Sequence, residues 1–105
     1  PRGIEKYNNW IKEPIKQGRL KDEVLIRVFF LGDSNPKQRK NLIRDYIEEL
    51  NSSKIELEKT KEEIEMLELN SKQKKSIKYQ LSTLQFGIDY LTFKEKWFQE
   101  LLADL

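Results

Sequence analysis

The chain has 105 residues, the length of one domain, and its formal net charge of +2 is too small to indicate a polyanionic partner. Charged residues make up 36% of the chain, above the usual ~25%, which is typical of long helices with a large solvent-exposed area. The absence of cysteine excludes disulfides, thiol nucleophiles and cysteine metal sites, and the absence of histidine removes the commonest metal ligand and proton shuttle. We therefore expect a non-enzymatic domain without a cofactor or metal.

Signals for membrane insertion or export are missing from this sequence. No apolar run approaches the ~18 residues of a transmembrane helix, and no signal-peptide pattern is present. We expect a cytoplasmic protein with no membrane partner. Because the chain opens on Pro1 rather than Met, we also expect it to be a fragment of a longer protein.

Residues 3–12 have the spacing of a short amphipathic helix. Its apolar positions recur at i, i+3, i+6 and i+7, and they are Ile4, Tyr7, Trp10 and Ile11. Pro14 ends this helix, so the whole element occupies about residues 1–13. The following segment, 15–19, has no apolar periodicity and is expected to be a connector.

Residues 20–31 are apolar almost throughout and rich in Val, Ile and Phe, a composition that fits a buried strand as well as a buried helix. We favour a buried helix, since Asp22 and Glu23 suit a first turn and Gly32 suits a C-terminal cap. No second strand-like run exists for this segment to pair with.

A long helical hairpin is predicted for the rest of the chain. Asn35 and Pro36 have the pattern of an N-cap followed by the first helical residue, and the apolar period near 3.5 then extends over residues 36–69. Asn70 and Ser71 break the pattern, and Ser71 is a candidate cap for a second helix over residues 72–105. The fold class is therefore predicted to be all-α.

The predicted hairpin has a seam of apolar residues on both helices, thinned in the middle of the first helix by Ser53 and Thr60 and interrupted in the second by Glu95. We expect the two helices to pack along this seam. Its residues are Ile43, Leu50, Leu57, Ile64, Ile77, Leu81, Leu84, Ile88, Leu91, Phe98 and Leu102.

The last helix has a second apolar face, roughly 130° around the helix from the seam at about 100° per residue. Its residues are Tyr79, Phe86, Tyr90, Phe93, Trp97 and Leu101. Gly87 lies between the two faces and costs about 1 kcal/mol relative to Ala, so we expect a close approach of another element there.

A second copy of the chain is the simplest cover for this second face. Helices of roughly 30 residues are about 45 Å long, so the hairpin would protrude from the short helices and leave an apolar stripe that soluble monomers rarely expose. Most such pairs are two-fold symmetric. The predicted dimer or core interface consists of Phe86, Gly87, Tyr90, Phe93, Trp97 and Leu101.

The order of these features resembles a known family. In chain order the shared features are Trp10-Ile11 with Pro14, Asp22-Glu23-Val24-Leu25, Val28-Phe29-Phe30, a long charged helix, Leu84, Gly87-Ile88, Trp97-Phe98 and Leu101-Leu102. By these residues the chain is similar to the C-terminal domain of PadR-like transcriptional regulators, also called the virulence activator alpha C-terminal domain.

The resemblance implies a bacterial repressor or activator whose C-terminal helices hold a homodimer together. It implies that DNA is contacted only through a winged helix-turn-helix domain before Pro1, and Gly3 is similar to the glycine that follows the wing in that family. Some members sense a small-molecule effector. For Tyr7 and Trp10 we expect packing in the core or at the domain junction, with contact to an effector as the alternative.

Other readings of the sequence are weaker. A self-contained helical adaptor that binds a partner protein's helix through the aromatic residues is the main alternative, and an enzyme is third. We assign no acid–base chemistry to the acidic cluster Glu62, Glu63, Glu65 and Glu68, which lacks any histidine or metal partner. We expect the basic cluster Lys72, Lys74, Lys75 and Lys78 to be solvated, although lysines of this kind also contact phosphates.

Overall fold

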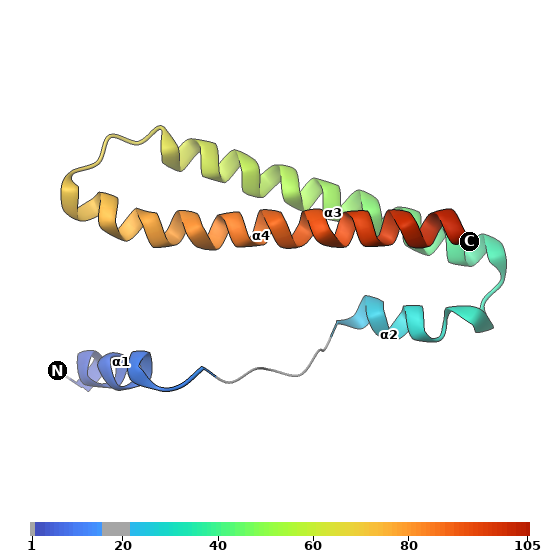
Figure 1. Ribbon diagram of the computed structural model, residues 1–105, viewed down its shortest axis with the longest axis horizontal. Helices are drawn as coiled ribbons and strands as arrows, with labels where there is room; N and C mark the ends of the chain where they lie inside the picture. Colours follow the sequence, from blue (N-terminus) through green and yellow to red (C-terminus); the bar gives the residue numbers. More distant parts are fainter. Residues whose placement is uncertain (1, 16–21) are drawn as a thin grey trace. The chain divides into compact units, whose positions relative to one another are not determined.

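The computed structural model describes residues 2–15 and 22–105, and every regular element in this part of the chain is helical. The chain divides into two compact units, residues 1–30 and residues 31–105. The first contains α1 (Arg2–Lys12) and α2 (Glu23–Phe29), and the second contains the short 3-10 helix η1 (Leu31–Asp33), α3 (Pro36–Glu65) and α4 (Ser71–Asp104). The predicted all-α fold is confirmed, and α3 and α4 pack against each other as an antiparallel hairpin (Figure 1).

Helix α1 forms where the apolar spacing predicts it and ends two residues before Pro14. Its last turn closes with a hydrogen bond from the Glu13 backbone N–H to the Trp10 carbonyl oxygen at 3.0 Å. None of its residues is buried. The predicted connector continues into residues 16–19, which lie outside the described part of the chain.

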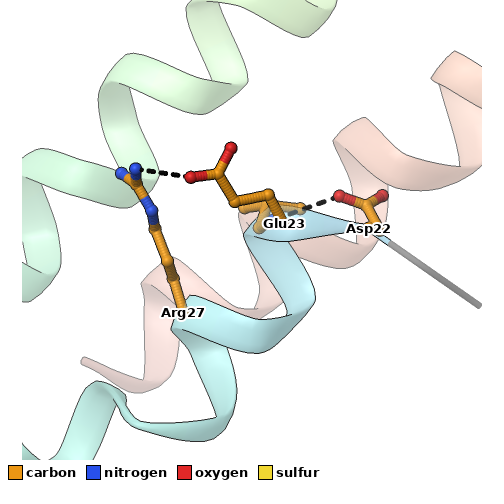
Figure 2. Close-up of polar contacts among 4 residues, drawn as sticks. Asp22, Glu23 and Arg27 are labelled. Carbon is orange, nitrogen blue, oxygen red and sulfur yellow. Dashed lines mark hydrogen bonds and ion pairs between the residues drawn. The ribbon is translucent and has the colours of Figure 1, made fainter.

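Helix α2 begins with a side-chain cap. The Asp22 carboxylate accepts a hydrogen bond from the Val24 backbone N–H at 3.1 Å, and Glu23 pairs with Arg27 one turn later at 2.8 Å (Figure 2). Such a cap satisfies one of the N–H groups that have no partner within a helix. The start of α2 is therefore fixed by local polar contacts.

The expectation of a buried helix over residues 20–31 needs correction. Residues 20–21 lie outside the described part, α2 ends at Phe29, and the Phe30 N–H caps it by donating to the Val28 carbonyl. Gly32 is not the cap, because it lies inside η1 and no glycine in the described residues has a positive φ. Val24 is the one buried residue of α2, and Phe29 is 81% exposed. A two-turn helix buries only one narrow stripe of its surface, so a segment that is apolar all round leaves its other apolar residues exposed.

The two long helices begin in the same way. Asn35 accepts from the Gln38 N–H at 2.8 Å in a reciprocal capping box, with Pro36 as the first helical residue, as predicted. At the start of α4 the cap is Asn70 rather than Ser71, since Asn70 and Gln73 form the same box at 2.9 and 3.0 Å.

Helix α3 ends at Glu65, four residues before the predicted end at residue 69. Asn70 has an extended backbone, so α3 cannot continue through this residue into α4. Leu67 and Leu69 nevertheless continue the apolar spacing, because they line the closed end of the hairpin. Periodicity alone therefore overestimates the length of α3.

The seam forms the core of the hairpin. Phe98 is 1% exposed, and the Tyr46 ring meets it edge-on with centroids 4.9 Å apart. The buried seam residues are Ile43, Leu50, Ile88 and Phe98. The half-buried ones are Leu57, Ile64, Ile77, Leu81, Leu84, Leu91 and Leu102. Every residue that the sequence assigns to the seam is thus at least partly covered.

Polar contacts join the two helices beside the seam. Lys54 Nζ lies 3.0 Å from a Glu95 carboxylate oxygen, and both side chains are mostly buried. Lys61 Nζ donates to Gln85 Oε1 at 2.7 Å. The interruption of the seam at Glu95 is therefore filled by a lysine from the opposite helix, and the two contacts together favour one antiparallel register.

Candidate functional site

Four aromatic side chains form an exposed stripe on α4, which we call the aromatic face. Their exposed fractions are 71% for Phe86, 44% for Tyr90, 64% for Phe93 and 39% for Trp97. The positions i, i+4, i+7 and i+11 place these rings on one side of a continuous 34-residue helix, over about 16 Å of its length. Within one chain the aromatic face is apolar and largely open to solvent.

The rings of the aromatic face are held by their neighbours. Phe86 and Tyr90 stack with an interplanar angle of 6° and centroids 6.3 Å apart. Trp97 packs edge-on against Phe98 at 4.9 Å, which connects the face to the buried seam. A face ordered in this way loses little conformational freedom when a partner covers it.

Lys94 lies between the aromatic face and α3. Its ammonium group is 5.3 Å from the centroid of the Tyr90 ring and 5.2 Å from that of Tyr46. These distances fall within the range of cation–π attraction. The lysine therefore links one ring of the aromatic face to α3 of the same hairpin.

The remaining residues assigned to the interface are more covered. Gly87 and Leu101 are half-buried. A Cβ atom at Gly87 would lie 3.0 Å from Leu57 Cδ1, so the close approach expected at this glycine comes from α3. Tyr79, two helical turns before Phe86, is 71% exposed and extends the apolar stripe toward the turn of the hairpin.

Tyr7 and Trp10 lie one turn apart on α1, with ring centroids 6.2 Å apart at a tilt of 49°. Both are exposed. Trp10 lines a surface cavity of about 470 Å³ with Ile11, Glu13, Pro14 and Ile15. Tyr7 is not among the residues that line this cavity, although its ring lies beside that of Trp10.

The acidic residues do not form a metal site in the part of the chain that the structure describes. No group of three or more carboxylates comes close enough to hold a metal ion there. None of the helices in residues 2–15 and 22–105 has the length and apolarity of a membrane span.

Sequence reasoning assigned no role to two lysines, Lys54 and Lys94. Lys94 lies beside Tyr90 of the aromatic face and Tyr46 of α3, and Lys54 pairs with Glu95 within the hairpin. The break in the seam at Glu95 was a signal that a cationic partner was needed. The identity of that partner depends on the register of α3 against α4, which apolar periodicity does not determine.

Comparison with known proteins identifies the family. The family model described as virulence activator alpha C-term matches residues 20–105, which include α2, α3 and α4. Searches of curated proteins and of solved structures gave no match. The matched family supports a regulatory helical domain, in agreement with the resemblance of the sequence. Because the match covers most of the chain, the chain belongs to the virulence activator alpha C-terminal family.

Proposed function

We propose that this domain dimerises a bacterial, cytoplasmic transcriptional regulator of the PadR-like group. In this proposal two copies pair through their aromatic faces and hold two winged-helix DNA-binding domains in register. The domain itself has no catalytic role. The family membership supports a regulatory domain, and the aromatic face supports the mode of pairing.

The observation that carries the proposal is the exposure of four large rings along one face of α4. Soluble monomers rarely leave contiguous apolar patches larger than a few hundred Å² open, and aromatic side chains are enriched at the buried centres of protein interfaces. Because α4 is one continuous helix, a second α4 related by a two-fold axis can cover the same face on both copies.

Sedimentation equilibrium at micromolar concentration tests the pairing. We expect a mass of about twice the 12.7 kDa of one chain. Replacing Phe86 and Phe93 together by Ala should return the mass to that of one chain, because both rings are exposed in the hairpin and would be covered only by a partner. The helical circular dichroism of this variant should match that of the parent.

Met66→Ala is the matched control, since Met66 is 84% exposed and lies in the turn of the same hairpin, away from the aromatic face. This variant should keep the dimer mass. A monomeric parent chain would contradict the proposal and would favour the alternative of an adaptor whose aromatic face binds a partner protein's helix.

In the proposed regulator, DNA is read by the winged-helix domain and not by this domain. Sequence-specific reading of a duplex needs an element that enters a groove and presents side chains to base edges. The exposed helices here carry charges of both signs, and their aromatic residues are assigned to pairing. We expect no sequence-specific binding by residues 1–105 in a gel-shift titration at physiological salt. We expect tight binding to a two-fold symmetric site when a winged-helix domain precedes them.

A further inference from the structure

The closed end of the hairpin contains a groove that the proposed dimer does not use. It lies between the end of α3, the turn and the start of α4, and its volume is about 410 Å³, within the range of about 300–1,000 Å³ typical of small-molecule sites. We call it the tip groove. Its floor is formed by Ile64, Leu67, Leu69, Ile77 and Leu81.

The floor of the tip groove is entirely aliphatic. It contains no aromatic ring on which a planar ligand could stack, whereas branched aliphatic side chains accommodate a flexible alkyl chain. Leu67 is exposed, and the other four floor residues are half-buried, so the floor is formed without being closed over. An alkyl group placed there would remove apolar surface of the protein and of the ligand from water.

The rim of the tip groove has an excess of positive charge. Lys74 and Lys78 line it one helical turn apart, and neither ammonium group has a hydrogen bond or ion pair within the described residues. Two like charges at i and i+4 repel each other on a helix. Glu65 is the one carboxylate in the lining, and it already lies 3.6 Å from Lys61 Nζ. An anion between the two lysines would relieve their repulsion.

We propose that the tip groove binds a free alkyl carboxylate of medium chain length. Its carboxylate lies between Lys74 and Lys78, and its chain runs over the aliphatic floor toward Leu81. The eight residues from Lys74 to Leu81 span about 10 Å of α4, which matches an extended chain of about eight carbons. The tip groove shares no residue with the aromatic face, so ligand binding there does not require the proposed dimer.

Octanoate is the probe, titrated into the 105-residue chain by calorimetry and followed by amide NMR shifts. We expect saturable binding with the largest shifts at Leu67, Ile77 and Leu81. Hexanoate should bind at least tenfold more weakly, because each buried methylene contributes about fourfold in affinity. Octylammonium, with the same chain and the opposite charge, should not bind.

Two double variants distinguish octanoate binding in the groove from attraction by general positive charge. Lys74→Gln with Lys78→Gln should weaken octanoate binding at least tenfold. Lys72→Gln with Lys75→Gln removes the same charge from the same turns of α4, outside the groove lining, and should leave the affinity unchanged. All four lysines are exposed, so circular dichroism should show the parent fold in both variants.

Several results would overturn the assignment. Equal losses in the two double variants would show attraction by general positive charge, and equal binding of octylammonium would show a purely apolar contact. Shifts confined to the aromatic face would place the ligand elsewhere. Binding to anionic phospholipid vesicles without binding of free octanoate would identify a membrane surface, not a free carboxylate, as the occupant.

Discussion

The two apolar faces of α4 differ in what covers them. Along the seam, Ile88 and Phe98 are buried against α3, whereas Phe86 and Phe93 on the aromatic face remain exposed although they belong to the same helix and have similar spacing. Periodicity shows that a helix has two faces to cover. Only the number and length of the other helices show which face the same chain can cover and which is left for a partner.

The largest difference in stability is expected when one phenylalanine on each face is replaced by alanine. Phe98→Ala should lower the free energy of unfolding by about 3–5 kcal/mol, or unfold the chain outright, because it empties a buried site against Tyr46 and Trp97. Phe93→Ala should cost less than about 1 kcal/mol at concentrations where the chain is monomeric. Urea denaturation measures both.

The stability losses of these two variants should depend differently on protein concentration. The loss caused by Phe98→Ala should be present at every concentration, whereas the loss caused by Phe93→Ala should grow as the parent chain associates, because association stabilises only the folded state. Equal losses at low concentration would show that the two faces do not differ in the way that their exposures indicate.

The contact at Gly87 gives the next largest effect. Gly87→Leu should lower stability by about 1–3 kcal/mol, since the added side chain meets Leu57 of α3. Gly87→Ala should have a smaller effect, because a gain of about 1 kcal/mol in helix propensity opposes the 3.0 Å approach of its Cβ to Leu57 Cδ1. In a Leu57→Ala background, Gly87→Ala should become stabilising.

Thermal unfolding of these variants tests where the glycine faces. A midpoint that is unchanged or raised in Gly87→Leu would mean that no neighbour lies at this position. Gly87 would then belong to the open side of α4 with the aromatic face.

The Lys54–Glu95 pair should have an intermediate effect. Glu95→Gln should lower stability by about 1–2 kcal/mol, between the values for exposed and fully buried ion pairs, because both side chains are mostly covered. Glu65→Gln, which breaks a more exposed pair with Lys61 at 3.6 Å, should cost less than about 0.5 kcal/mol. If urea denaturation gives equal losses, the Glu95 contact does not help to hold α3 on α4.

The smallest effect concerns the start of α4. Asn70→Ala should cost about 1 kcal/mol, because it removes the side chain that accepts from the Gln73 N–H. Ser71→Ala should change stability by only a few tenths of a kcal/mol, since Ser71 is already inside the helix. The opposite ranking in urea denaturation would restore Ser71 as the cap.

Much of the fold was predictable because it depends on local signals. The Asn35–Pro36 start of α3 and the apolar spacing of the seam are local, and both appear in the structure. The extents of α2 and α3 were overestimated. Apolar residues continue past the end of a helix when they line a turn, as after α3, or flank a short helix in the sequence, as around α2.

The sites were predictable only in part. Helical spacing identified the rings of the aromatic face, but their exposure depends on how much of α4 a single α3 can cover. The tip groove had one sequence signal, the basic cluster from Lys72 to Lys78, which we interpreted as solvated. Only the folded hairpin places Lys74 and Lys78, and not the other two lysines, beside aliphatic residues from the end of α3 and the turn.

In the proposed dimer, the aromatic face of one copy is covered by the same face of the second copy. The most direct measurement is isotope-filtered NOE spectroscopy on an equal mixture of isotope-labelled and unlabelled chain, which detects only contacts between copies. We predict intermolecular NOEs to the ring protons of Phe86, Tyr90 and Phe93, and none to the methyl group of Met66. Intermolecular NOEs confined to other surfaces, or their absence at concentrations where the chain is a dimer, would contradict the account.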